Sequence, residues 1–250
     1  MNKINKILES LKINYKSWIF TIISIILLSH NYSIINSIVT YFVVFFLSYI
    51  SHYQTHIDTT NASIHLYHHE NNNFFSHFIQ ILLEFTSLLA IIPILSILEL
   101  NVLNPWIIIF FYFFYTTVHN VNYSILHVNN VHEKHHKMMK TNIGPDICDI
   151  IFNTKFDDDI ENTDHYIINI IISFLFVYFL QHFWIKSDEF TKNMLIYLFN
   201  IILGISGLII FYYGNKLKNI KCKNIKCKNI KKKTDKSQKK KCKNLKKDKI

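Results

Sequence analysis

The chain has 250 residues, of which 50% are hydrophobic and 15% aromatic, and lysine supplies all 27 of its basic side chains. The net charge of +10 is unevenly distributed: residues 215–250 hold 17 Lys against two Asp, and residues 1–214 hold 10 Lys against 15 acidic residues. The folded part is therefore mildly acidic (10 − 15 = −5) and the tail strongly basic (17 − 2 = +15), which excludes a basic folded domain as the source of the overall charge.

Long apolar segments follow one another along residues 18–213. They run from Trp18 to Leu28 with a continuation to about Tyr32, and over Ile35–Ser51, Phe78–Leu100, Pro105–Val118, Tyr166–Ile185 and Met194–Tyr213. A membrane-spanning helix needs about 20 apolar residues. The last two segments meet this length, the first two are short enough that a shallow hairpin is an alternative, and a soluble helical core is disfavoured by their number. The sequence predicts an all-α integral membrane protein with about six transmembrane or hairpin helices in three pairs.

Pairing these segments into three hairpins places four stretches on one side of the membrane: residues 1–17, 52–77, 119–165 and the tail. Most lysines of residues 1–214 fall in the first three stretches, and the opposite side carries only Lys186 and Lys192. Because positive residues accumulate on the cytoplasmic side, this face is predicted to be cytoplasmic. The predicted organisation is a cytoplasmic segment at 1–17, a membrane domain at 18–214 and the tail at 215–250.

The tail repeats the unit Lys-Asn-Ile-Lys-Cys around Cys222 and Cys227 and then decays into lysine runs. Like charges with few apolar residues between them predict disorder. A polybasic segment next to a membrane helix favours anionic lipid headgroups as its partner over nucleic acid, and a solvated tail without a partner is an equal alternative. The cysteines form no metal-binding pattern and are interpreted as reduced thiols.

Histidines are ordered along the predicted cytoplasmic face. They form a His52-x-x-x-His56 pair and two His-x-x-His-His units, and all candidates are His52, His56, His65, His68, His69, His119, His127, His132, His135 and His136. Spacings of three and four place side chains on one face of a helix, one turn apart. Two such units facing each other predict a metal site with room for two ions, and imidazole-rich sites suit Fe, Zn or Cu. His30, His165 and His182 are interpreted as ordinary packed or solvated residues, and His77 is left open.

These motifs resemble the fatty acid hydroxylase/sterol desaturase superfamily of integral-membrane enzymes. The resemblance covers roughly residues 35–156 and includes Asn142-Ile-Gly144 and Asp149-Ile-Ile-Phe152-Asn-Thr154, which are similar to the family's signature after its last histidines. Asn153 stands where the family usually has Gly. His119 resembles the isolated middle histidine of the family, and His127 has no firm counterpart.

The resemblance implies a centre of two iron ions that uses O₂ to hydroxylate or desaturate a C–H bond of a bilayer lipid. It also implies a separate electron donor, a cytochrome b5-like protein or a reductase, and residence in the endoplasmic reticulum. Candidate groups for orienting the ring N–H bonds are Glu70, Glu133, Asp146 and Asp149.

Two other functions compete with this interpretation. A membrane zinc hydrolase is disfavoured because no His-Glu-x-x-His motif places a general base between two ligands. A catalytically idle membrane protein of the same fold is disfavoured because the spaced histidine clusters are intact.

Overall fold

The computed structural model describes residues 2–57, 63–71, 73–99 and 102–247, with side chains described up to residue 218. All regular secondary structure in the described residues is helical, as predicted. Its elements are α1 (Lys3–Ile13), α2 (Tyr15–Leu27), α3 (Ile34–Ile57), α4 (Ser63–Glu70), α5 (Phe74–Leu89), α6 (Ile91–Ile97), α7 (Pro105–Thr117), the π-helix η1 (Val118–Ile125), α8 (Val131–Lys137), α9 (Asp146–Phe152), α10 (Tyr166–Lys186) and α11 (Glu189–Lys247).

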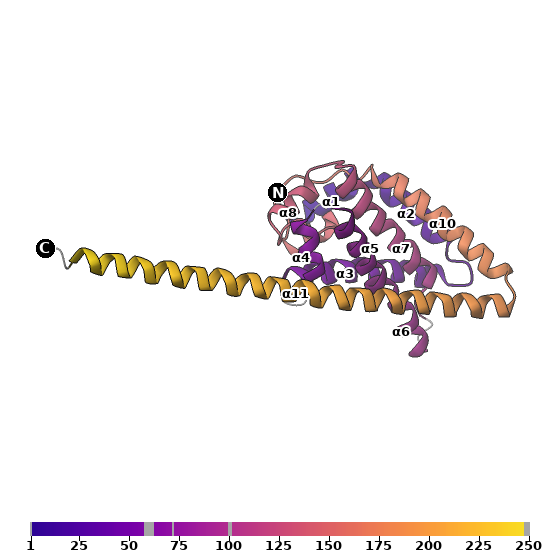
Figure 1. The fold of residues 1–250 in the computed structure, drawn as a ribbon. Helices are drawn as coiled ribbons and strands as arrows, with labels where there is room; N and C mark the ends of the chain where they lie inside the picture. Colours follow the sequence, from indigo (N-terminus) through magenta and orange to yellow (C-terminus); the bar gives the residue numbers. More distant parts are fainter. Residues whose placement is uncertain (1, 58–62, 72, 100–101, 248–250) are drawn as a thin grey trace.

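The long apolar helices lie side by side in one bundle (Figure 1). Helix α10 packs on α2 and α7, α3 packs on α7, and α11 runs along α5 and α4. Four stretches are long and apolar enough to cross a membrane: Ile34–Ile57, Phe74–Ile97, Tyr166–Lys186 and Glu189–Lys218. Helix α2, with 13 residues, is about 20 Å long and falls short of the roughly 30 Å hydrocarbon core. The six predicted elements are present as helices, and four of them have the length of a span.

Helix α3 is longer than its predicted apolar segment, because it continues past Ser51 to Ile57 and spans 24 residues. No Gly or Pro interrupts the sequence between Ile34 and Ile57, so nothing in the backbone stops the helix at its first polar residues. The first histidine pair therefore lies on the last turns of a helix of membrane-spanning length, rather than in a connecting segment.

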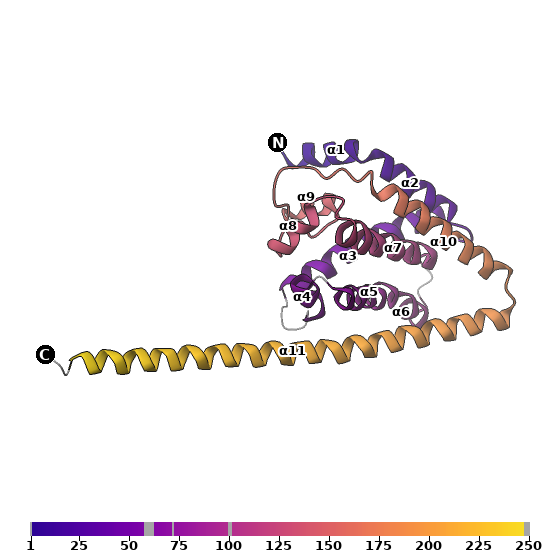
Figure 2. The same cartoon turned by 45° about the horizontal axis from the view of Figure 1, so that its top comes forward.

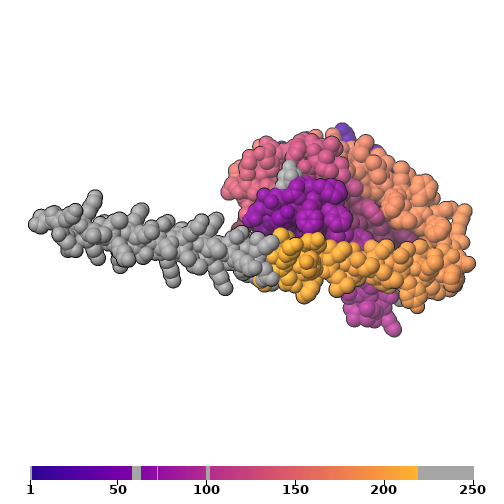
Figure 3. Space-filling model, in the orientation of Figure 1, coloured from indigo at the N-terminus to yellow at the C-terminus, as the bar shows by residue number. Residues whose placement is uncertain are grey.

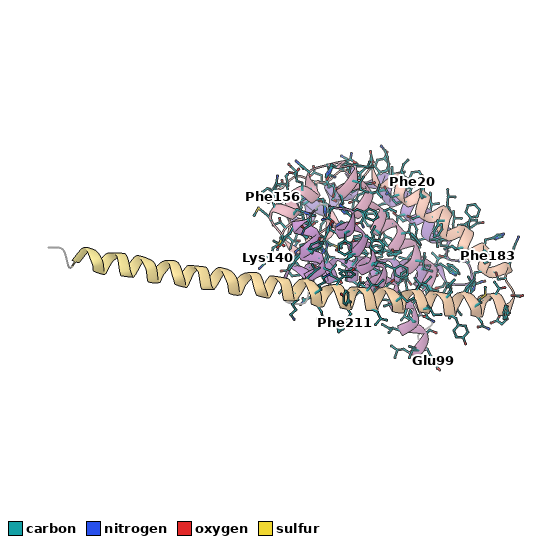
Figure 4. The ribbon with its side chains drawn as sticks, viewed as in Figure 1. Phe20, Glu99, Lys140, Phe156, Phe183 and Phe211 are labelled. Atoms are coloured by element: carbon teal, nitrogen blue, oxygen red, sulfur yellow. The ribbon has the colours of Figure 1, made fainter. Side chains whose placement is uncertain are left out.

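The outer surface of the bundle is apolar. Phe20, Phe183 and Phe211 project outward from α2, α10 and α11 (Figure 4), and their side chains are exposed along with many Ile and Leu residues. The interior is a core of aliphatic and aromatic side chains in which Phe110 and Phe111 of α7 are fully buried. Apolar side chains on both faces of long helices are typical of a bundle that is surrounded by lipid.

The shorter helices α1, α4, α8 and α9 lie at one end of the bundle, near the N-terminus (Figure 2). The connections α2–α3 and α10–α11 lie at the opposite end, together with α6. This arrangement agrees with the predicted pairing of the apolar helices into hairpins. That the first end is cytoplasmic stays a prediction.

Helix α11 has 59 residues, of which the apolar first half lies against the bundle and the rest extends beyond it. The predicted disorder of residues 215–250 falls mostly on residues beyond 218, whose side chains lie outside the described part. It stays a prediction, as does the binding of anionic lipid headgroups by this tail.

Asn104 holds three apolar helices together at the end of the bundle opposite to the histidines. Its side chain is fully buried, accepts a hydrogen bond from Trp106 N at the start of α7, and donates to Leu28 O and Ser37 Oγ. Its backbone N–H donates to Thr40 Oγ1. One residue therefore caps α7 and ties it to α2 and α3.

Replacing Asn104 with Ala should destabilise the detergent-solubilised protein by about 2 kcal/mol, because the cap of α7 and two further buried hydrogen bonds of the side chain are lost. Thermal unfolding followed by circular dichroism measures the effect. Asn193→Ala, at an exposed position of α11, is the matched control and should leave the transition unchanged. Equal transitions for both variants would contradict this role of Asn104.

Candidate metal centre

Histidines from three elements, α3, α4 and α8, meet at one end of the bundle. Two groups have ring nitrogens close enough to bind one ion each, with one ligand atom per residue and all of these atoms within 4.8 Å of one another. The first group is His52, His56, His65, His69 and His135, and the second is His68, His132 and His136. The predicted clusters are thus brought together, and they form sites that could hold metal ions.

In the first group, the Nε2 atoms converge on that of His65. His65 Nε2 lies 3.1 Å from His52 Nε2 and 3.0 Å from both His56 Nε2 and His69 Nε2. One nitrogen cannot share a single proton with three others. With metal–nitrogen bonds of about 2.1 Å, however, two ligands at right angles lie about 3.0 Å apart, whereas tetrahedral ligands lie about 3.4 Å apart. The observed spacing fits ligands at right angles around one ion.

The second group is smaller and lies beside the first. His136 Nε2 is 2.8 Å from His132 Nε2, and the ring of His68 has its centroid 5.3 Å from that of His136. The rings of His69 and His136 are stacked with centroids 4.1 Å apart, so the two groups are in direct contact.

Each His-x-x-His-His unit is divided between the two groups. The first and last histidines, four residues apart, stay together: His65 with His69, and His132 with His136. The middle residue of each unit crosses to the other group, His68 to the second and His135 to the first. On a helix, residues i+3 and i+4 differ by about 100° in direction. The unit therefore presents ligands to two adjacent ions, which explains the pair of neighbouring histidines at its end.

His119 stands next to the second group. It lies on the π-helix η1, is buried, and its ring centroid is 4.8 Å from that of His132 and 5.6 Å from that of His68. Its Nδ1–H donates to the carboxylate of Glu84, which leaves Nε2 as a free lone pair without a hydrogen-bond partner. A short π-helix is frequent at functional sites, and here it places a possible further ligand beside the second group.

Glu84 and Gln80 link His65 of the first group to His119 beside the second group through hydrogen bonds. Both side chains are buried on α5. Gln80 Nε2 donates to Glu84 Oε1 at 3.0 Å, so that Gln80 Oε1 faces His65 and accepts from its Nδ1 at 3.2 Å. Asn120 Nδ2 donates to Glu84 Oε2 at 3.1 Å. The network fixes the tautomers of His65 and His119, each with its Nε2 lone pair directed at the centre.

His135 is fixed by the segment that follows it. Its Nδ1–H donates to Thr141 O at 2.7 Å, and its fully buried Nε2 has no hydrogen-bond partner. The segment is closed by Asp149, which accepts from Ile143 N at 3.0 Å and Gly144 N at 2.8 Å. The segment from Asn142 to Phe152 is therefore held together by Asp149, and it supports the position of His135 in the first group.

Asn153 is the residue that departs from the sequence resemblance described above. It ends α9 with φ +57°, a left-handed conformation that Gly adopts freely and Asn tolerates better than most residues. The departure from the family pattern therefore preserves the backbone turn.

The predicted orienting carboxylates lie elsewhere. Glu70 is exposed, and Glu133 is exposed and paired with Lys137. Asp146 is buried in an ion pair with Lys155, and Asp149 accepts the backbone hydrogen bonds described above. The described ring N–H groups of His65, His119 and His135 are instead held by Gln80, Glu84 and Thr141 O. A signal for the first two was present, because isolated polar residues on an apolar span face the interior of a bundle.

Two further histidines of the predicted cytoplasmic face, His127 and His77, lie outside the two groups. His127 is exposed in the connection after η1 and belongs to neither group. His77 lies on α5 with its ring centroid 5.1 Å from that of His68, which places it at the edge of the second group.

Several buried ring nitrogens of the centre have no hydrogen-bond partner. They include both nitrogens of His68 and the Nε2 atoms of His119 and His135. A buried nitrogen left unpaired costs about 1–3 kcal/mol, whereas a neutral imidazole nitrogen is a good ligand for a transition metal. The residues therefore fit metal ions, and this fit is independent of any resemblance between sequences.

Burial and neighbouring rings keep these histidines neutral. Burial lowers the pKa of His68 to about 2, of His135 to about 3 and of His136 to about 4, and it also lowers the pKa of His65 and His132. Neutral imidazole is the form that binds a metal ion. The environment thus maintains the ligands in their binding form at neutral pH.

Comparison with known proteins yields no match: no family model, no curated protein and no solved structure is similar to this chain.

The metal-free protein should lose stability as the pH falls from about 6.5 towards 5. The folded-state pKa values of His68, His135 and His136 lie below the unfolded value of about 6.5, so the unfolded chain binds more protons in this range. Each fully buried histidine contributes up to about 1.4 kcal/mol per pH unit to the decrease. Chelator-treated protein in thermal unfolding provides the measurement. His135→Gln should flatten the profile and His127→Gln, at an exposed position, should not; a pH-independent profile would contradict this account.

Glu84→Gln should weaken metal binding about 10- to 100-fold, as expected when the group that orients a ligand is changed. The amide keeps the shape of the side chain, but it removes the negative charge that holds His119 Nδ1–H. Titration of the metal-free protein with zinc or iron measures the affinity. Glu99→Gln, exposed after α6, is the control. Wild-type affinity in Glu84→Gln would show that His119 and its partner do not take part.

Proposed function

We propose that the chain is a membrane-bound oxidoreductase that uses two iron ions and O₂ to hydroxylate or desaturate a C–H bond of a lipid. The observation that carries the proposal is the pair of all-imidazole groups in direct contact, formed at the end of apolar helices. The resemblance of the histidine motifs to the fatty acid hydroxylase/sterol desaturase superfamily supports the same reaction.

The ligand geometry favours iron over zinc. Structural and catalytic zinc sites usually have four ligands in a tetrahedron, whereas the first group offers five nitrogens with Nε2 atoms about 3.0 Å apart. Among the described residues, the groups contain no cysteine and no carboxylate placed to act as a hydrolytic base. Two irons would be held by the first group and by the second group completed with His119. Bound iron supplies the activation of O₂ and the oxidising power that an unactivated C–H bond requires.

The protein's own residues supply geometry and shielding. Gln80, Glu84 and Thr141 O hold the Nδ1 protons of three histidines, so that their Nε2 atoms face the ions. His65 and His135 are almost fully buried, which excludes bulk water from the reacting centre. The apolar surface around the bundle gives a lipid access to the centre without leaving the bilayer.

The proposal includes a separate electron donor, a cytochrome b5-like protein or a reductase, at the histidine-bearing end. We place that end on the cytoplasmic side, and the protein in the endoplasmic reticulum if the cell is eukaryotic. His127 is left out of the ligand set because it is exposed and belongs to neither group.

Expression of the intact chain in a host membrane should produce a hydroxylated or unsaturated lipid that is absent with the His135→Ala, His136→Ala variant. These substitutions remove one ligand from each group. Lipid mass spectrometry under air and under ¹⁸O₂ is the measurement, and a hydroxylated product should carry the heavy isotope. His127→Ala is the control and should behave as the intact chain. Identical lipid profiles for the intact and doubly substituted proteins, both present in the membrane, would contradict the proposed reaction.

A further inference from the structure

A groove runs along the outside of the bundle, next to the first histidine group. Its volume is about 680 Å³, within the range of about 300–1,000 Å³ of small-ligand sites. It lies between α3, α4 and α11, and Figure 3 shows α4 lying directly against the part of α11 that borders it. Ser63 Oγ donates to Gly214 O at 2.9 Å, which fixes α4 on α11 at this level.

The two halves of the groove differ in chemistry. Leu47 and Ile50 of α3 and Ile210 and Phe211 of α11 line an apolar half, within stretches long enough to span a membrane. The other half is lined by polar side chains, with Lys218 as its cation; they are Ser51, Gln54, Thr55, Asn215 and Lys218. No acidic residue is among the described lining residues. The apolar half of the groove suits an acyl chain, and the lysine at its other end suits an anionic head group.

The groove leads to the metal centre. A smaller cavity of about 80 Å³ lies between α3 and α5 and is lined by His52, His65, Gln80 and Glu84. The groove and this cavity share Ser51, Thr55, His65 and Leu83 in their walls. His65 is itself a member of the first histidine group, so a chain in the groove lies directly against that group.

A third cavity, on the other side of the centre, has a different charge. It has a volume of about 110 Å³, adjoins His52, His119 and His132, and is also lined by three carboxyl groups, those of Asp146, Asp149 and Glu161. Asp146 is paired with Lys155, which leaves an excess of acidic groups. This cavity disfavours an anionic head group, and its volume is well below the roughly 300 Å³ at which small-ligand sites begin.

We propose that the groove between α3 and α11 binds one acyl lipid with an anionic head group, a carboxylate or a phosphate. The head lies at Lys218, and the acyl chain lies along Leu47, Ile50 and Phe211. That this lipid is the molecule oxidised rests on the proposed function; that it binds in the groove does not.

Photo-labelling of the full-length protein in lipid nanodiscs tests the site without turnover. The probes are a diazirine-bearing fatty acid, the matching fatty alcohol with the same chain, and a diazirine-bearing phosphatidic acid. Peptide mass spectrometry should find labels within 47–55 and 210–218. At least one anionic probe should label them about fivefold more than the alcohol, the ratio expected for an interfacial ion pair. The more strongly labelling anion identifies the source of the head group.

Two variant pairs sharpen the result. Lys218→Gln should reduce labelling by the anionic probe to the level of the alcohol, whereas Lys192→Gln, at the other end of the apolar part of α11, should not. Ile50→Trp should fill the groove and reduce labelling by all probes, whereas Ile35→Trp, also exposed on α3, should not. Labels on the third cavity, which Phe111 also lines, or equal labelling by acid, phosphatidic acid and alcohol, would overturn the proposal.

The outcome separates the two proposals. Labels in the groove of a protein that binds no iron would support the site and remove its role in oxidation. An oxidised lipid product together with labels only around Phe111 would support the oxidation reaction and overturn the groove as its binding site.

Discussion

The structure depends on one constraint, which is that many unprotonated imidazole nitrogens are buried at one point without hydrogen-bond partners. His68, His119 and His135 carry such nitrogens, and three Nε2 atoms lie about 3.0 Å from that of His65. Without a shared electrophile these lone pairs repel one another and lose their hydration. Bound metal ions would remove both costs, and the surrounding helices bring these nitrogens together.

The surrounding elements serve this convergence in different ways. Helix α3 supplies a histidine pair from its last two turns, and α4 and α8 each give ligands to both groups. The π-helix η1 brings His119 to the second group, while Glu84 and Gln80 on α5 hold two rings from behind. Glu84 and Gln80 are buried in a helix of membrane-spanning length. The free-energy cost of burying their polar groups there is tolerable only if these groups form hydrogen bonds. The same need for hydrogen bonds explains why the buried Asp149 accepts from Ile143 N and Gly144 N in the segment that follows His135.

Much of the architecture could be predicted from the sequence, because apolar length and histidine spacing are local signals. The spacing in His65-x-x-His68-His69 correctly indicated that these side chains gather on one side of a helix. It could not show that His68 and His135 cross to the opposite group, because the crossing depends on how α4 faces α8. Proximity in sequence to the histidine clusters favours Glu70 and Glu133, which are exposed, whereas Glu84 lies far from the clusters in sequence and reaches His119 only through the fold. Apolar length alone does not predict the extension of α3 to Ile57, because the helix continues over polar residues.

X-ray absorption at the iron edge, combined with an iron count on protein purified without added zinc, tests the central claim most directly. We predict about two irons per chain, each with nitrogen neighbours near 2.1 Å and no sulfur in its shell. A protein that holds no metal, or a single ion bound through sulfur, would contradict it.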